Sequence, residues 1–164
     1  MKASSMRRIG AATIAAAAAL ALTPVSAHDR NGDGPSRPDP LVGYWVGTVT
    51  VVDCSSGASF FSFSTGQLIN QGGTINTTDY TNPPTSSGPG FGYWYPRKHG
   101  GYFVRFRFAE YTPDGQVSGF RVVSKTVTLD GPDQQSSVIS SAATDPSGNV
   151  LFTRCAKETA TRFR

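Results

Sequence analysis

After residue 40, short stretches of hydrophobic residues mixed with Gly, Ser and Thr are separated by turn dipeptides at regular intervals. This pattern is typical of an all-β protein, and no later segment has the period of an amphipathic helix. The pattern predicts eight strands, at 44–53, 60–70, 74–78, 91–96, 102–111, 117–129, 136–144 and 150–157. The second of these is less regular and is clear only at its end, Leu68-Ile69. Short connections between the strands predict an antiparallel up-and-down barrel.

The two cysteines are placed where such a barrel would close. Cys54 follows the first predicted strand and Cys155 lies in the last one. An even-stranded antiparallel barrel brings its first and last strands side by side, so we expect one disulfide to join them across the seam.

The turn at 112–115 allows the register of one hairpin to be predicted. Pro113-Asp114-Gly115 suits a type I turn followed by a left-handed glycine that forms a bulge, so that Thr112 faces Gln116. The pairs that follow are Phe108 with Phe120, Phe106 with Val122, and Val104 with Ser124. These residues would share the inner face, extended by Thr126 and Glu110, and the outer face would hold Arg105, Arg107, Arg121 and Lys125. Val127 and Leu129 fit this register poorly, which leaves a second bulge open.

The first 27 residues have the features of a signal peptide. Lys2, Arg7 and Arg8 precede an Ala-rich apolar run at 9–22, which is too short for a membrane span. Val25-Ser26-Ala27 fits the small-residue pattern before a cleavage site. We therefore expect cleavage near Ala27 and a periplasmic or extracellular protein, in a compartment that permits the disulfide. The two adjacent arginines leave both general secretion and twin-arginine export open.

Residues 28–40 are rich in Asp, Gly, Pro and Arg and contain no apolar residue, so we expect a flexible leader ahead of one barrel domain at 41–164. The segment 1–27 holds three basic and no acidic residues, so most of the formal net charge of +4 belongs to it. No basic run or stripe remains beyond it, and we expect no binding to nucleic acid.

Several motifs occur in the order and spacing of a known group of barrels. Gly43-Tyr44-Trp45 opens the first predicted strand and Thr161-Arg162-Phe163 closes the chain. Between them lie Gly72-Gly73-Thr74, Gly90-Phe91-Gly92-Tyr93-Trp94, Asp114-Gly115, Leu129-Asp130-Gly131 and Gly148-Asn149. Together they resemble the calycin barrels (lipocalins, avidins and their relatives) and small exported bacterial barrels likened to lipocalins or allene oxide cyclases. The resemblance implies that Trp45 plugs one barrel end and that Arg162 or Arg164 stacks on its ring.

Metal and nucleophile chemistry find little support in the chain. The two histidines are His28, in the leader, and His99, in a turn, and two cysteines about a hundred residues apart favour a disulfide over zinc. We expect neither a metal nor a cofactor. The Gly-x-Ser-x-Gly motif of serine hydrolases is absent.

Three functions stay open. The first is a non-enzymatic exported barrel that holds a small apolar or aromatic molecule, because eight strands are just wide enough for one small ligand. The predicted ligand-binding residues are Phe106, Phe108, Phe120, Tyr102 and Trp94, although Trp94 also fits an ordinary core position. The second is a cyclase or isomerase, with Glu110 as the candidate acid–base group unless solvent surrounds it. The third is a protein-binding or protease-inhibitor barrel that acts through the leader.

Overall fold

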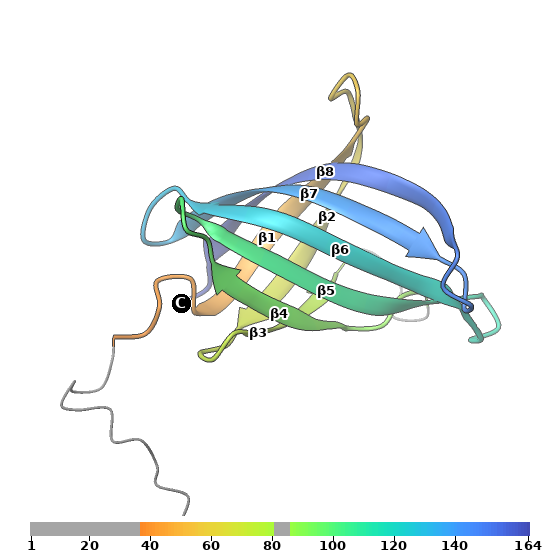
Figure 1. Cartoon of the computed structure of the whole chain (residues 1–164), viewed down its shortest axis with the longest axis horizontal. Coiled ribbons are helices and arrows are strands. Elements are labelled where there is room, and N and C mark those ends of the chain that lie inside the picture. Colours follow the sequence, from red (N-terminus) through yellow and green to blue (C-terminus); the bar gives the residue numbers. More distant parts are fainter. Residues whose placement is uncertain (1–36, 81–85) are drawn as a thin grey trace, which may run out of the picture. The chain divides into compact units, whose positions relative to one another are not determined.

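The computed structural model describes residues 37–80 and 86–164, which form a closed barrel of eight antiparallel strands (Figure 1). The strands are β1 (Gly43–Val52), β2 (Ser59–Ile69), β3 (Thr74–Asp79), β4 (Gly90–Pro96), β5 (Tyr102–Tyr111), β6 (Val117–Leu129), β7 (Gln134–Thr144) and β8 (Val150–Arg162). β1 pairs with both β2 and β8, so the predicted barrel and its seam are confirmed. The predicted signal peptide and residues 28–36 of the predicted leader lie outside the described residues.

The irregular pattern of β2 has a structural reason. Its second half, from Thr65 to Ile69, pairs with both β1 and β3. Its first half pairs along β1 only, and this hairpin extends beyond the body of the barrel (Figure 1). Residues 59–62 are therefore exposed on both faces, so no alternation of apolar and polar residues is required there.

The β5–β6 hairpin contains the predicted turn but not the predicted register. The amide of Thr112 donates to the carbonyl of Gln116 (2.8 Å), and Gly115 has a φ of 82°. Tyr111 then pairs with Val117, while Glu110 pairs with Gly119, so an additional residue, Ser118, is inserted into β6. Inserting one residue turns every later side chain of the strand to the opposite face.

This second bulge corrects the predicted faces of β6. Phe108 pairs with Arg121, Phe106 with Val123, and Val104 with Lys125. The expected pairing of Phe108 with Phe120, Phe106 with Val122 and Val104 with Ser124 is therefore wrong. Four residues expected on the inner face lie on the outer face instead: Phe120, Val122, Ser124 and Thr126. Two residues expected on the outer face, Arg121 and Lys125, point inward.

The shift also accounts for the two residues that fitted the predicted register poorly. Val127 is fully buried in the core and Leu129 packs against it. Arg105 and Arg107, on β5, face outward and are exposed, as the sequence predicts. Only the β6 side of the hairpin was assigned to the wrong face.

Trp45 and the segment before β1 close one end of the barrel, called here the plugged end. Trp45 is fully buried, and its Nε1 donates to the carbonyl of Leu41 (2.9 Å). Arg162 pairs with Trp45 across the seam, and its Cζ lies 4.2 Å from the centre of the indole ring. The same guanidinium donates to the carbonyls of Pro40 and Val42. One arginine thus joins the last strand to the segment that precedes the first.

The barrel interior is layered along its axis. The plugged half is filled by an apolar cluster that consists of Leu41, Trp45, Ile69, Ile75, Trp94, Val104, Val127 and Ala160. A smaller cluster nearer the other end consists of Val49, Val123, Ile139 and Ala156, and Phe106 packs against both. Along β6 and β8 the two clusters are separated by inward polar residues, Lys125 and Glu158.

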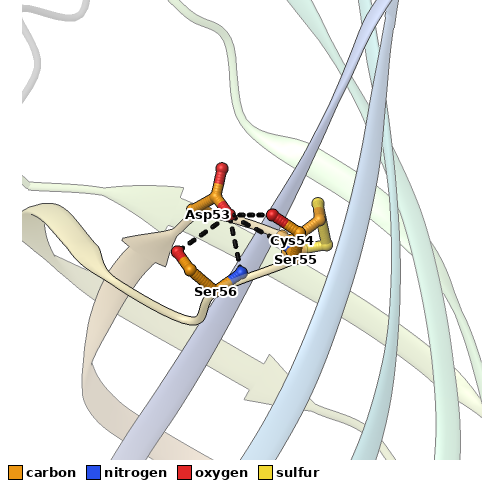
Figure 2. The surroundings of a disulfide bond; sticks show 5 residues. Asp53, Cys54, Ser55 and Ser56 are labelled. Carbon is orange, nitrogen blue, oxygen red and sulfur yellow. Dashed lines mark hydrogen bonds between the residues drawn. A yellow bond between two sulfur atoms is a disulfide. The ribbon is translucent and has the colours of Figure 1, made fainter.

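The disulfide links the turn after β1 to β8. Cys54 and Cys155 are bonded, with their Cα atoms 5.2 Å apart. One carboxylate oxygen of Asp53 accepts hydrogen bonds from the amide and hydroxyl groups of Ser55 and Ser56, which fixes the turn that carries Cys54 (Figure 2). These bonds hold the pKa of Asp53 well below its usual range. The predicted disulfide at the seam is confirmed.

Candidate functional site

The half of the barrel opposite the plugged end encloses a cavity of about 560 Å³, a size that suits a small organic molecule. Five aromatic side chains contribute to its wall: Phe61, Phe63, Phe106, Phe108 and Phe152. Five aliphatic side chains complete the apolar lining: Val49, Val51, Val123, Ile139 and Ala156. These ten side chains come from six strands, β1, β2, β5, β6, β7 and β8, because alternate residues of each strand point into the barrel.

Gly90, on β4, has no side chain and so leaves room for the ring of Phe106. A Cβ atom at Gly90 would lie 2.9 Å from Cδ2 of Phe106 and 2.5 Å from Cγ2 of Thr77. Both distances are shorter than side chains tolerate without moving. The missing side chain therefore lets the Phe106 ring lie against β4, where it lines the cavity and covers the plugged core.

The inner end of the cavity is polar. Five buried side chains form what we call the floor cluster: Thr65, Gln67, Lys125, Ser137 and Glu158. Lys125 Nζ lies 2.7 Å from Glu158 Oε2, and the two side chains are only 2% and 3% exposed. Lys125 also donates to Gln67 Oε1. All members except Ser137 line the cavity, so an ion pair in the middle of the barrel borders the space where a ligand would lie.

The carboxylate of Glu158 is surrounded by donors. Its Oε1 accepts from Thr65 Oγ1 (3.2 Å) and from Gln67 Nε2, and its Oε2 accepts from Lys125 Nζ and Ser137 Oγ (2.8 Å). Burial alone would raise the pKa of Glu158. The charge of Lys125 and the hydrogen bonds outweigh burial, so the net shift of this pKa is downward. The floor cluster therefore favours the ionised carboxylate of Glu158.

The mouth of the cavity carries a second ion pair and one further arginine. Arg121 Nη2 lies 2.6 Å from Glu110 Oε1, and both side chains are partly exposed. The guanidinium groups of Arg121 and Arg154 lie 5.1 Å and 5.0 Å from the ring centre of Phe152. The rim thus places two guanidinium groups near an aromatic ring, one of them paired with Glu110, while the wall below is apolar.

The predicted site residues are distributed over three places. Phe106 and Phe108 line the cavity, and Glu110 lies at its mouth in the ion pair with Arg121. Phe120 lies on the outer surface, where the Cζ of Arg107 is 3.6 Å from its ring centre. Its expected position on the inner wall is wrong because of the additional residue in β6.

Trp94 and Tyr102 belong to the plugged half and are absent from the cavity lining. Their rings pack edge to face with centroids 5.7 Å apart, and Trp94 Nε1 donates to the carbonyl of Asn70 (3.0 Å). Burial, together with a hydrogen bond to Asp39, raises the pKa of Tyr102 to about 12. Ligand binding by these residues stays a prediction, and the structure places them in the core beneath the floor cluster.

The floor cluster is the part of the site that sequence reasoning missed. Lys125 was expected on the outer face, and Glu158 lies just beyond the predicted end of the last strand at residue 157. The alternation Ala156, Glu158, Ala160 is the one available signal. Small residues flank the acid at the inward positions, whereas Lys157 and Thr159 occupy the outward ones. The small neighbours leave room for a carboxylate inside the barrel.

The described residues contain no group of three or more His, Cys, Asp and Glu side chains that could hold a metal ion. Within residues 37–80 and 86–164 there is also no helix long and apolar enough to cross a membrane. No protein-family model matches the chain, and no curated protein matches it.

Proposed function

We propose that this chain is an exported barrel that binds one small, largely apolar or aromatic molecule in its open cavity, without catalysis. The observation that carries the proposal is the cavity itself: about 560 Å³, walled by five phenylalanines and closed at one end by the Trp45 plug. Concave sites with an apolar wall and a few polar groups are the usual form of small-molecule sites. The disulfide and the signal-peptide pattern support export.

We further propose that the barrel is related to the calycins or to the allene-oxide-cyclase-like barrels. The support is the buried Trp45 beneath the guanidinium of Arg162, together with eight strands closed by pairing of the first with the last. This relationship would fit a ligand held inside the barrel rather than on its surface.

The binding function can be tested with N-phenyl-1-naphthylamine, a small aromatic probe whose fluorescence rises in apolar surroundings. Two neighbouring residues of β7 provide a test position and its control. Ile139 lines the cavity, whereas Val138 is 68% exposed on the outer face of the barrel. We expect Ile139→Trp to fill the cavity and weaken probe binding at least tenfold. Val138→Trp should bind like the wild type.

Thermal melting must accompany the titration, because overpacking by a large ring costs about 1–3 kcal/mol where space is tight. A folded Ile139→Trp protein that binds the probe as well as Val138→Trp would contradict the proposed site. A wild-type protein that does not bind the probe at all would contradict the proposed function.

A cyclase or isomerase is the second candidate, favoured by the ionisable groups that border the cavity. A simple binder needs only the space, whereas an enzyme of this kind needs a group that can exchange a proton. Glu158 is poorly suited to act as a base because its pKa is lowered and its oxygens are occupied. Glu110, at the mouth, is the remaining candidate. In an enzyme, Glu110→Gln should abolish turnover and leave binding intact.

A further inference from the structure

Among residues 37–80 and 86–164, the floor cluster leaves one hydrogen-bond donor without a protein acceptor. Glu158 accepts from four donors, and the amide nitrogen of Gln67 donates to Glu158 and lies 3.5 Å from Thr65 Oγ1. An ammonium has three N–H groups. Within the described part of the chain, Lys125 has two acceptors, Glu158 and Gln67. The described residues offer no acceptor for its third N–H, and Lys125 lines the cavity.

We infer that the ligand of this cavity carries a neutral oxygen acceptor at its inner end, a carbonyl or ether oxygen, which accepts the third hydrogen bond of Lys125. The inference rests on the proposed binding function and names the ligand class: an apolar or aromatic body with one inward oxygen. A buried donor without an acceptor is costly, and a hydrogen bond from a charged donor is stronger than a neutral one.

The charge of the floor cluster selects a neutral oxygen over an anion. Glu158 Oε2 lies 2.7 Å from the same Nζ atom, so a ligand carboxylate held by Lys125 would lie beside another carboxylate. Like charges in a buried site oppose each other, and the ion pair already balances the charge of Lys125. A cation finds no free acceptor on Glu158, because all four of its hydrogen bonds come from protein donors.

The wall above the floor cluster fits the rest of such a ligand. Phe106, Phe108 and Ile139 line the cavity together with Lys125, and Ile139 is the cross-strand partner of Lys125. A flat apolar body placed there would contact these side chains while its oxygen points to the floor. Any anionic end would instead lie outward, near Arg121 and Arg154 at the rim.

Three probes of nearly the same shape separate these ligand classes. They are 2-acetylnaphthalene, 2-isopropenylnaphthalene, in which a methylene replaces the ketone oxygen, and 2-naphthoate. Leaving water costs the ketone its hydrogen bonds with the solvent, so an apolar cavity without a donor prefers the alkene. With the donor of Lys125 in place, calorimetric titration should give the reverse order, with the ketone binding about tenfold tighter than the alkene and the naphthoate weakest.

The amine itself provides a second readout in the unmodified protein. In ¹⁵N-labelled protein, the ammonium signal of buried Lys125 should shift when 2-acetylnaphthalene binds and stay in place at saturation with the alkene. The exposed amines of Lys98 and Lys157 are internal controls. Their signals should not move with either probe.

Each outcome bears on one claim. If none of the three probes binds, the proposed function fails together with the inference. If the alkene binds as tightly as the ketone or tighter, or the Lys125 signal does not respond to the ketone, binding stands and the inference is overturned. If 2-naphthoate binds most tightly, the inner end accepts an anion, and the neutral oxygen is overturned.

Discussion

Removing the charge of Lys125 while Glu158 remains is the sharpest test of the floor cluster. Lys125→Met keeps most of the side chain's length and leaves Glu158 without an ion-pair partner among the described residues. Removing one partner of a buried pair typically costs about 3–5 kcal/mol. Since Thr65, Gln67 and Ser137 still donate to the carboxylate, we expect the lower part of that range, about 3 kcal/mol at pH 7.

The cost should depend on pH with a defined sign. In the wild type the folded-state pKa of Glu158 lies below its ordinary value of 4.5, so its contribution to stability is present above 4.5 and lost as the pH falls through the folded pKa. Without Lys125, burial raises the pKa of Glu158. The protonated carboxyl is then favoured in the folded state, and the variant loses stability as the pH rises through that raised pKa. The gap between the two proteins should therefore be wide at pH 7 and narrow at pH 4.

Urea unfolding followed by circular dichroism at both pH values measures this gap. Lys125→Met/Glu158→Leu removes both charges and should recover most of the loss, because apolar replacement of a buried ion pair is often neutral or better. Lys157→Met is the matched control on the exposed face and should stay within about 0.5 kcal/mol of the wild type. A gap that does not change with pH, or a double variant as unstable as the single one, would refute the reasoning.

Two further predictions concern the plug and the seam. Trp45→Ala should lower the free energy of unfolding by about 3–5 kcal/mol, because it truncates a large buried side chain. The control Val46→Ala, at an exposed position, should stay within about 0.5 kcal/mol of the wild type. An unchanged melting curve for Trp45→Ala would contradict its role as the plug. Reducing the disulfide, whose cysteines lie 101 residues apart, should lower the free energy of unfolding by about 4–5 kcal/mol in the chain-entropy model. Denatured, unreduced protein should show no reactive thiol, so two thiols per chain would contradict the bond.

The strands and the seam could be predicted because their signals are local. Alternation marks a strand wherever one face is buried, and positive-φ glycines such as Gly73, Gly115 and Gly148 mark the turns between strands. The pairing of Cys54 with Cys155 then follows from closing the barrel. The ends of β7 and β8 were predicted less well. Gln134 and the residues after Lys157 extend these strands with polar and small side chains, which carry little strand signal.

The face that each side chain presents could not be predicted from one hairpin, since it depends on contacts with a distant strand. With β5 and β6 considered alone, a register that places Phe120 and Val122 inside buries the most apolar surface. That register would put Arg121 and Lys125 outside and remove the present ion-pair partners of two inward carboxylates, Glu110 and Glu158.

The additional residue Ser118 resolves this conflict, because it turns both basic side chains inward to the acids at 2.6 Å and 2.7 Å. The bulge turns Phe120 to the outer face, where its ring packs against the guanidinium of Arg107. The register of β6 and the floor cluster are therefore determined together. The acid on β8 requires a buried cation, and the bulge at Ser118 brings Lys125 to that position.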